Sequence, residues 1–326
     1  MKLGIIGAGL IVRTFLPHLT KLENIEIKGI MNTHSDEAER LAGEYGIPLH
    51  THDLQELLQA DIDTVYVAVP NHLHFEFCRA ALECGKHVIV EKPMCSTYEE
   101  AAALQKLAVE KKLFLFEAIT TLYMPGFLKV REWLDRIGGV RIVETNYTQY
   151  SSRYPAFQRG EILPVFDPNK CGGALMDLNV YNVHYVMGLF GKPESYTYFA
   201  NIERNIDTGG MLILKYPGFT ANCMAAKDCQ GHIGSVILGT EGLIRTYHQA
   251  NRIGKVVLEL YDGTKEEFDD GMEDCREIPE FTAFAREIAA GDLESCYAVL
   301  QKSVDAAEVM SKARRAAGVL FPADQQ

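Results

Sequence analysis

Residues 1–120 alternate between short apolar runs and amphipathic segments, and this alternation restricts the fold more than any other feature. The runs are rich in Val, Ile, Leu or Phe and have the length of buried strands, whereas the segments between them have helical periodicity. Strands joined by helical crossovers form parallel sheets, so we expect an α/β domain with a doubly wound, Rossmann-type sheet. The six runs are residues 2–7, 25–31, 47–51, 64–69, 87–90 and 113–118.

Capping residues support the expected helix limits in this region. An Asp, Asn, Ser or Thr before a helical segment caps its first turn, and a Glu three residues later completes a capping box. A glycine just after the segment supplies the left-handed C′ residue. The expected N-caps are Ser35, Asp53 with Glu56, Asn71, and Thr97 with Glu100, and the expected C′ glycine is Gly85.

The pattern changes after residue 120. Strand-like segments follow one another with few helices between them, and Gly, Pro, Asp and Asn occupy their connections, which is typical of a mainly antiparallel sheet. A helix is expected over residues 173–191, and two more helices, near 280–289 and 297–316, close the chain. We therefore predict two domains: the α/β domain over residues 1–120, and an α+β domain over residues 121–326.

Composition excludes several classes of protein. The net charge of −12 disfavours binding to nucleic acid or to an anionic membrane. No apolar run is long enough to cross a bilayer. The eight cysteines are scattered, without a C-x-x-C or another zinc-ligand spacing. We therefore expect a reduced, cytoplasmic protein without a metal site.

A glycine-rich turn follows the first expected strand. Gly7 permits a tight turn, and Gly9 lets a pyrophosphate approach the start of the next helix. Leu10 and Ile11 form the first turn of that helix, and Val12 stands where the usual fingerprint has its third glycine. A strand–turn–helix context at the start of a βαβ unit predicts that these residues bind a dinucleotide.

The end of the second strand indicates which dinucleotide is bound. An Asp or Glu there would bind the ribose 2′-hydroxyl of NAD, but this chain has Asn32 and Thr33. No carboxylate at these positions would repel a 2′-phosphate, and Arg13 in the first helix could reach one. The residues favour NADP, although Asn32 can also hydrogen-bond a ribose, so NAD stays open.

Two more strand ends carry polar side chains. Pro70, Asn71 and His74 follow the fourth strand, and we expect them to contact the cofactor. Glu91 and Lys92 follow the fifth strand. Because the carboxyl ends of parallel strands form the ligand edge of such a sheet, Glu91 and Lys92 are candidate cofactor contacts. Lys92 is also a candidate catalytic residue, since an ammonium there could polarise a substrate hydroxyl.

The helix expected over residues 173–191 carries a polar stripe. Asp177, Tyr181 and His184 are spaced i, i+4 and i+7, so they share one helical face. Proton-active side chains on one stripe of an apolar helix indicate a catalytic face, but a buried cluster that only fixes the helix to its sheet would give the same pattern. The glycine pair at residues 172–173 lets the backbone approach another group closely.

These segments together resemble the glucose–fructose oxidoreductase, inositol dehydrogenase and rhizopine-catabolism (Gfo/Idh/MocA) family. The resemblance rests on GIIGAGLI, AVPNHLH, ALECGKHVIVEKPM and GGALMDLNVY, and it covers nearly the whole chain. It implies that Lys92 is the catalytic lysine and that Asn71 and His74 touch the cofactor. It also implies that Asp177 lies on a substrate helix. Tyr181 stands where many members have histidine, which is similar to the dimeric dihydrodiol dehydrogenase branch.

The resemblance implies an NAD(P)-dependent dehydrogenase or reductase that transfers hydride between nicotinamide and a CH–OH group. In this hypothesis Tyr181 is the general acid/base, and the charge of Lys92 lowers the pKa of Tyr181. Asp177 orients Lys92 or a substrate hydroxyl, and His184 is a further candidate. The substrate would be a sugar, a polyol or a dihydrodiol, with a trans-dihydrodiol or an aldose such as xylose as the specific expectation.

Two other functions stay open at this point. One is a glycoside hydrolase of the same fold that retains NAD, and the other is a non-catalytic dinucleotide sensor. The resemblance also implies that the second domain binds substrate and that its open-faced sheet joins subunits into a homodimer or homotetramer.

Overall fold

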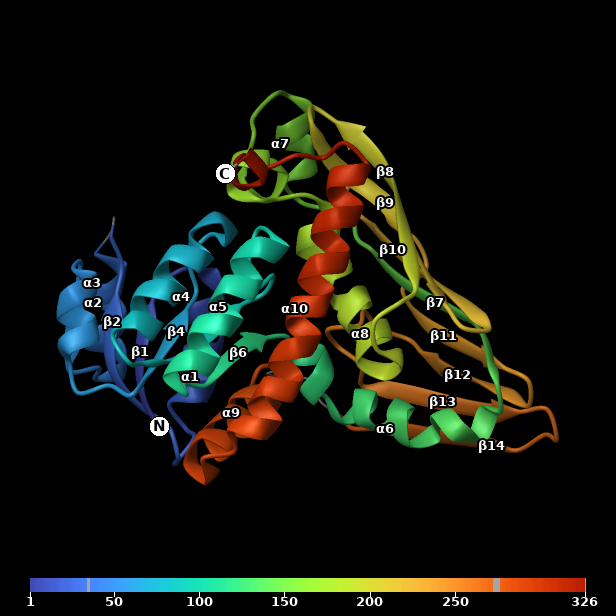
Figure 1. The fold of residues 1–326 in the computed structure, drawn as a ribbon, viewed down its shortest axis with the longest axis horizontal. Helices are drawn as coiled ribbons and strands as arrows, with labels where there is room; N and C mark the ends of the chain where they lie inside the picture. Colours follow the sequence, from blue (N-terminus) through green and yellow to red (C-terminus); the bar gives the residue numbers. More distant parts are fainter. Residues whose placement is uncertain (34–35, 272–275, 326) are drawn as a thin grey trace. The chain divides into compact units, whose positions relative to one another are not determined.

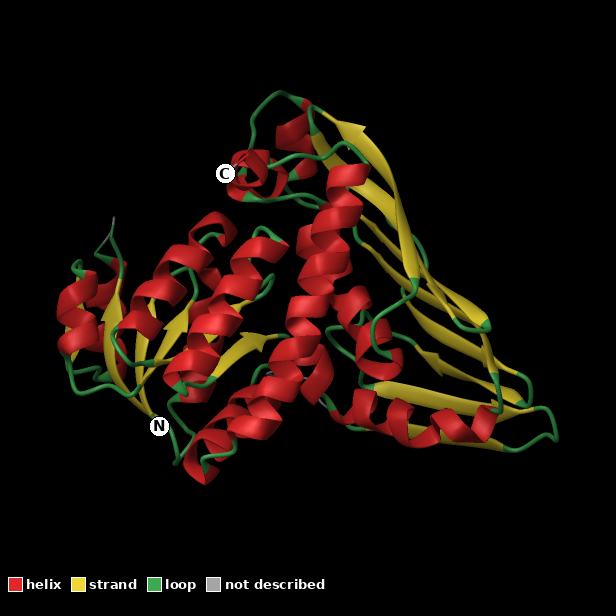
Figure 2. Ribbon diagram, in the orientation of Figure 1, coloured by secondary structure: helices red, strands yellow, loops and turns green. Residues whose placement is uncertain are grey.

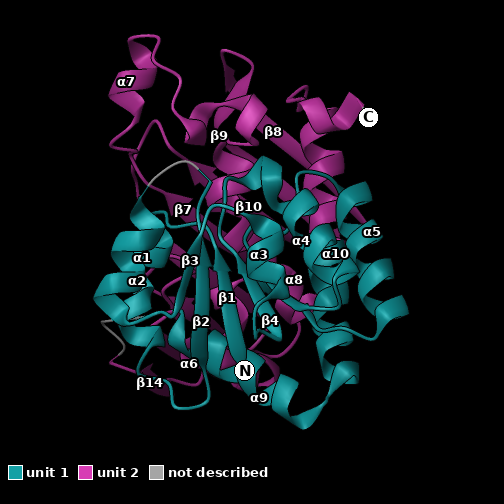
Figure 3. Ribbon diagram, turned by 90° about the vertical axis from the view of Figure 1, so that its left-hand side faces the viewer, with its two compact units in different colours: residues 1–118, 277–304 teal, residues 119–276, 305–326 magenta. Residues whose placement is uncertain are grey.

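The computed structural model describes residues 1–33, 36–271 and 276–325. Its contacts group the chain into two compact units, coloured separately in Figure 3. Unit 1 comprises Met1–Ala118 and Glu277–Val304, and unit 2 comprises Ile119–Arg276 and Asp305–Gln326. Unit 1 thus includes a segment from near the end of the chain, whereas a division into two continuous domains at residue 120 stays a prediction.

Unit 1 is built on a six-stranded, parallel sheet, as expected (Figure 1). The strand order is β3-β2-β1-β4-β5-β6, and this order reverses direction between β1 and β4, where doubly wound sheets bind their ligands. The strands are β1 (Lys2–Ile6), β2 (Glu26–Met31), β3 (Leu49–Thr51), β4 (Thr64–Val67), β5 (His87–Glu91) and β6 (Leu115–Ala118).

Helices connect these strands and cover the sheet (Figure 2). Thr97 and Glu100 form the expected capping box, and Gly85 has the expected positive φ of 74°. The helices are α1 (Leu10–Leu19), α2 (Glu37–Tyr45), α3 (Leu54–Gln59), α4 (His74–Glu83) and α5 (Tyr98–Lys111), followed near the C-terminus by α9 (Ile278–Ala290) and α10 (Leu293–Ala316).

Two of the expected caps differ from the structure. Asp53 accepts a hydrogen bond from the N–H of Gln55 at 2.7 Å, as predicted, but Glu56 does not complete a capping box because its carboxylate accepts from the Thr51 hydroxyl. Asn71 caps no helix through its side chain, since a 3₁₀ turn (Asn71–Leu73) precedes α4. Ser35 lies outside the described residues.

Aromatic side chains explain why α9 belongs to unit 1. Phe281 of α9 lies 5.3 Å from Phe15 and 5.2 Å from Tyr66, measured between ring centroids. Phe284, one turn later, stacks on Phe116 of β6 at 4.5 Å. All five rings are buried, so the apolar face of α9 extends the core of the Rossmann sheet.

Unit 2 is built on an eight-stranded sheet with the order β14-β13-β12-β11-β7-β10-β9-β8. Only the β7–β10 pair is parallel, so the expectation of a mainly antiparallel sheet is confirmed. The strands are β7 (Val140–Thr148), β8 (Ser195–Glu203), β9 (Ile206–Tyr216), β10 (Phe219–Ala226), β11 (Gly234–Gly239), β12 (Gly242–Thr246), β13 (Lys255–Leu260) and β14 (Lys265–Asp269).

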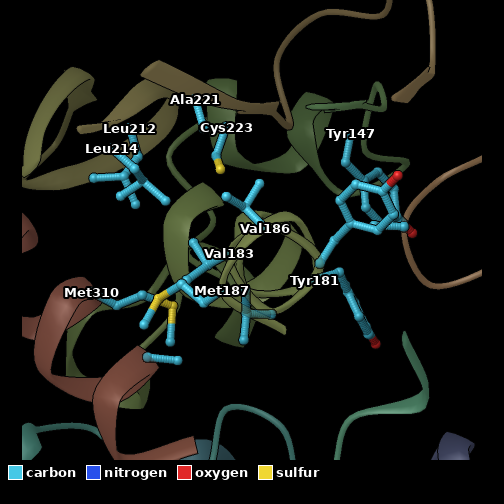
Figure 4. Packing of buried hydrophobic residues seen from close by; sticks show 14 of the residues in the cluster. Tyr147, Tyr181, Val183, Val186, Met187, Leu212, Leu214, Ala221, Cys223 and Met310 are labelled. Atoms are coloured by element: carbon cyan, nitrogen blue, oxygen red, sulfur yellow. The ribbon is translucent and has the colours of Figure 1, made fainter. Parts of the chain in front are cut away.

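Helices lie along one face of this sheet, and no described helix covers the other face (Figure 2). The helices of unit 2 include α6 (Pro125–Trp133), the short α7 (Tyr154–Gln158), α8 (Val180–Phe190) and the C-terminal part of α10. Val183 and Val186 of α8 pack with Leu212 of β9 in the buried core (Figure 4). Across both units, none of the described helices is both long enough and apolar enough to span a membrane.

Candidate active site

The glycine-rich turn of unit 1 has the geometry that a bound pyrophosphate requires. Gly7 has a φ of +110°, and a Cβ on it would lie 2.2 Å from the backbone oxygen of Ala68. Gly9 is the N-cap of α1; no side chain caps this end, and no other atom lies within 4 Å of the place of a Cβ. Leu10 is exposed and Ile11 half-buried in the first turn. The open N–H groups of the helix fit an anionic ligand.

The end of β2 carries no acidic side chain at the two expected selector positions. The N–H of Asn32 donates to the carbonyl oxygen of Thr51 at 3.2 Å, and Thr33 is exposed. Arg13, one turn into α1, is about half exposed, and its Nη1 lies 3.4 Å from Oε1 of Glu37 on α2. Residues 32–33 therefore offer no carboxylate to a ribose 2′-hydroxyl, and the guanidinium of Arg13 is paired with Glu37.

His74 connects the two loops that follow β4 and β5. The ring is completely buried, with Nδ1 2.9 Å from the carbonyl oxygen of Pro93 and Nε2 2.9 Å from that of Val69. Burial lowers the pKa of His74, which favours the neutral ring. These contacts favour a positioning role, and a direct cofactor contact stays a prediction. Pro70 and Asn71 lie exposed and half-buried in the same loop.

The turn after β5 is fixed by neighbouring side chains. Glu91 accepts a hydrogen bond from the hydroxyl of Tyr66, whose pKa is raised by burial and by the Glu91 charge. Half-buried Lys92 follows, and its peptide bond to Pro93 is cis. The N–H of Met94 then donates to Oε1 of Glu117 at 2.8 Å. Lys92 therefore lies on a turn that is anchored on both sides.

The helix that carries Asp177, Tyr181 and His184 does not begin as an α-helix. Leu175–Asn179 form a π-helical segment, η6, and α8 starts at Val180. The prediction of one continuous α-helix is therefore wrong at this junction, and a shared face for the three side chains stays a prediction. Tyr181 and His184 are buried, whereas the Asp177 side chain is 29% exposed.

Asp177 has a partner that the sequence did not indicate. Its carboxylate forms an ion pair with Nζ of Lys227, the residue that follows β10. The Lys227 side chain is only 3% exposed. Lys227 is therefore a cationic partner of Asp177 within unit 2, and the expected interaction of Asp177 with Lys92 or with a substrate stays a prediction.

Tyr181 lies beside a second phenol. Its ring centroid is 6.0 Å from that of Tyr147 on β7, and the two planes are tilted by 35°. The hydroxyl of Tyr147 accepts a hydrogen bond from Nδ2 of Asn251 at 3.3 Å. Figure 4 shows Tyr181 pointing away from the leucines of β9, Leu212 and Leu214. Tyr181 thus belongs to an aromatic corner of the core and not to its aliphatic centre.

A buried carboxylate holds the start of the π segment. Asp207 of β9 accepts hydrogen bonds from the N–H of Leu175 and from the hydroxyl of Tyr198, each at 2.7 Å. Burial raises the pKa of Asp207 to about 6. A Cβ on Gly173 would lie 2.0 Å from Oδ1 of Asp207. This contact is the close backbone approach that the glycine pair predicted.

The sequence analysis did not predict three residues that hold the candidate site residues or their segments in place. They are Glu117 in unit 1 and Lys227 and Asp207 in unit 2. A signal existed for Glu117, because an acid at the end of the apolar run 113–118 is unusual in a buried strand. Lys227 and Asp207 gave no signal. Charged residues commonly flank strands of an exposed sheet, and only the tertiary contacts show that these two are buried.

A doubly wound sheet with this glycine-rich turn, followed by an α+β unit, defines a class of dinucleotide-dependent enzymes. Comparison with known families agrees with this class. Residues 1–118 match the oxidoreductase family with an NAD-binding Rossmann fold, and residues 127–245 match the GFO/IDH/MocA C-terminal domain. The chain belongs to the GFO/IDH/MocA oxidoreductase family.

Characterised relatives and solved structures resemble the chain over nearly its whole length. The scyllo-inositol 2-dehydrogenase (NADP(+)) IolU of Bacillus subtilis is 32% identical and is matched over 100% of this chain and 99% of its own length. The trans-1,2-dihydrobenzene-1,2-diol dehydrogenase of Mus musculus is 26% identical, over 100% and 99%. The 3-ketoreductase KijD10 of Actinomadura kijaniata, solved with NADP and TDP-benzene, has a TM-score of 0.82 at 25% identity, with 97% of each chain covered.

These comparisons confirm the expected family, the NAD(P)-binding fold and the oxidoreductase class. They leave the roles of the individual residues as predictions.

Proposed function

We propose that the protein is an NADP-dependent dehydrogenase or reductase that interconverts a secondary alcohol and a carbonyl on a polyhydroxylated small molecule. The observation that carries this proposal is the anchored Lys92 turn at the carboxyl end of β5, on the ligand edge of an NAD(P)-binding sheet. The absence of an acid at residues 32–33 supports NADP over NAD, and Arg13 in the first helix is the proposed partner of the 2′-phosphate. The names of the relatives IolU and KijD10, the latter solved with NADP, agree with this preference.

Each candidate residue receives one role. When bound, the nicotinamide supplies or accepts the hydride. Tyr181 takes the hydroxyl proton of the alcohol during oxidation and returns it to the carbonyl oxygen during reduction. The ammonium of Lys92 stabilises the phenolate of Tyr181 and the developing negative charge on the substrate oxygen. A KijD10 variant with one tyrosine changed to phenylalanine has been solved in complex with NADP and TDP-benzene.

Asp177 is assigned to substrate binding and His184 to a supporting position. The Asp177 carboxylate is partly exposed and can accept a hydrogen bond from a hydroxyl, as polyol sites require. His184 is buried and therefore suits a contact with other protein groups better than one with substrate. Three of the relatives are named as dehydrogenases of scyllo-inositol, a dihydrodiol and D-xylose. Each of these compounds has hydroxyl groups on neighbouring carbons, which supports a vicinal diol as the feature that the site recognises.

The open face of the unit 2 sheet is proposed as the contact between subunits. Phe199, Met211 and Met224 are cross-strand neighbours on β8, β9 and β10, and Phe199 is 64% exposed. An exposed apolar row on a face without a described helix fits a second copy of the same sheet. A reduced, cytoplasmic setting is also proposed, because the seven cysteines in the described part of the chain form no disulfide.

A coenzyme titration followed by a substrate panel tests the proposal. The purified protein should bind NADPH at least tenfold more tightly than NADH, as measured by fluorescence titration. With the preferred coenzyme, it should oxidise at least one of scyllo-inositol, D-xylose and a trans-dihydrodiol. Tightly retained NAD in the purified protein, with no net reduction of added coenzyme, would instead indicate a hydrolase.

A further inference from the structure

A buried lysine beside the substrate helix has no role in the reaction as described above. Lys227 follows β10, and its main chain is tied on both sides: its N–H donates to Thr208 at 2.7 Å, and its carbonyl accepts from the N–H of Ser151 at 2.9 Å. Its side chain is 3% exposed. A long cationic side chain with this burial needs a compensating partner.

The partner of Lys227 is the carboxylate that we assign to substrate binding. Its Nζ contacts Oδ2 of Asp177 and lies 5.3 Å from the ring centroid of Phe166. Desolvating an ammonium costs several kcal/mol. The ion pair with Asp177 and the cation–π contact with the Phe166 ring together offset that cost. The buried Lys227 holds the Asp177 carboxylate from the protein interior. The Asp177 side chain is 29% exposed, so part of it stays accessible to a ligand.

The surrounding charges explain why a cation is needed at this position. Asp207 is completely buried and accepts from the N–H of Leu175, two residues before Asp177. The charge of Lys227 lowers the pKa of Asp207 in part, although burial dominates and raises it. Asp228 accepts from the Thr208 hydroxyl at 2.7 Å. Lys227 therefore offsets negative charge close to the π segment that presents Asp177.

We propose that Lys227 is a positioning residue that fixes the Asp177 carboxylate so that it accepts a hydrogen bond from a substrate hydroxyl next to the reacting carbon. The inference rests on the proposed function and specifies its substrate class: compounds with a hydroxyl on the neighbouring carbon. Lys227 itself does not touch substrate. Its effect is confined to ligands that offer that hydroxyl, which separates this role from a general contribution to folding.

The test compares ligand pairs that differ in one hydroxyl. scyllo-Inositol and D-xylose are each paired with a deoxy analogue that lacks the hydroxyl next to the reacting carbon. Dissociation constants are measured by calorimetry at saturating NADPH, which requires no turnover. We expect Lys227→Met to weaken binding of the hydroxylated ligand at least tenfold and to change binding of the deoxy analogue less than twofold. Lys227→Arg should restore most of the difference.

Three controls separate the explanations. Asp177→Asn should reproduce the effect, and the double variant Lys227→Met with Asp177→Asn should be no weaker than Asp177→Asn alone. Lys192→Met, which removes a lysine paired with Glu308 elsewhere in unit 2, should have no effect. NADPH affinity and the melting transition followed by Trp133 fluorescence verify that the Lys227 variants are folded.

The outcomes are distinct for the two proposals. Equal weakening of both ligands of a pair by Lys227→Met, no weakening of either, or no discrimination between them by the unmodified protein would overturn the role of Lys227. Discrimination at the binding step without oxidation of any ligand would leave the role of Lys227 supported and would overturn the proposed reaction.

Discussion

The turn that carries Lys92 is fixed by side chains that themselves do no chemistry. His74 contacts the carbonyl oxygen of Pro93, and Glu117 accepts from the N–H of Met94. A lysine side chain has many rotamers, so a rigid backbone on both sides reduces the number of positions its ammonium can adopt. This arrangement agrees with a catalytic role for Lys92 in the proposed reaction.

Lys92→Ala and Tyr181→Phe should each lower kcat by about 10²–10⁴-fold, the range for loss of a proton-transfer group. Coenzyme affinity should change less than about threefold, because neither side chain is assigned to the pyrophosphate or the ribose. Steady-state kinetics on the best substrate and NADPH titration measure the two quantities. Unchanged kcat in both variants would contradict the roles given to these residues.

Asp207 makes stability depend on pH in an identifiable window. Its pKa of about 6 lies above the ordinary value of 3.8, so the protonated form is favoured in the folded protein. Well below pH 4 the group is protonated in both the folded and the unfolded chain, so it does not affect stability. Between about pH 4 and pH 6 the unfolded chain releases this proton while the folded protein retains it, so the free energy of unfolding falls by about 3 kcal/mol across that window and changes little above it, because one pKa unit corresponds to about 1.4 kcal/mol.

Asp207→Asn should therefore gain stability relative to the unmodified protein as the pH rises from 4.5 to 7.5. Asparagine can still accept from the N–H of Leu175, so the fold should be retained. Urea unfolding followed by Trp133 fluorescence reports on unit 2, since this is the single tryptophan. Asp228→Asn is the matched control. If the difference in free energy of unfolding between Asp207→Asn and the unmodified protein did not vary with pH, the Asp207 carboxyl would not be the cause of the pH dependence.

The π segment η6 is held in place by contacts with neighbouring strands and loops and not by local sequence preference. Leu175 donates to Asp207 of β9, and Asn179 donates to the Cys223 carbonyl of β10 at 2.9 Å. A π turn is intrinsically less favourable than an α turn and commonly marks a functional position. The glycine at residue 173 is required because Asp207 occupies the space of its Cβ.

Gly173→Ala should destabilise unit 2 by about 1–3 kcal/mol more than Gly263→Ala. The two glycines have similar φ values, +99° and +96°, so their backbone strain is comparable. The two positions differ in the space available for a methyl group. A Cβ at Gly263 would meet no atom within 4 Å, whereas a Cβ at Gly173 would collide with Asp207. Unfolding followed by Trp133 fluorescence compares the variants. Equal losses at the two positions would mean that the collision relaxes without cost.

One face of the unit 2 sheet is covered by none of the described helices, and it carries exposed apolar side chains. Phe199, Met211 and Met224 are neighbours across three strands, and Ile142 on β7 is 51% exposed. Subunit contacts of this kind remove apolar area from water, at about 25 cal/mol per Å². The proposed oligomer would therefore depend on these side chains.

Phe199→Lys should shift the protein from dimer or tetramer toward monomer in sedimentation velocity, because a buried ammonium would face apolar side chains. Ile162→Lys, at a residue that is 50% exposed in the loop after α7, should leave the assembly unchanged. A monomeric unmodified protein, or an Ile162→Lys variant that dissociates as readily, would contradict the proposed interface.

Local patterns were sufficient for the architecture and for most of the nucleotide site. Strand and helix periods are set by residues a few positions apart, so the parallel sheet, its glycine-rich turn and the Thr97–Glu100 cap were predicted. The Asp177–Tyr181–His184 stripe was predicted as α-helical because no local rule signals a π turn.

Residue identity along the chain determined the family, the coenzyme class and the candidates Lys92 and Tyr181, since these depend on motifs whose members are close in sequence. Tertiary structure decided what surrounds them. The Lys227–Asp177 ion pair joins residues 50 positions apart, and His74 reaches a carbonyl 19 positions away. Such contacts depend on how strands and loops pack, and the burial that makes them strong exists only after the chain has folded.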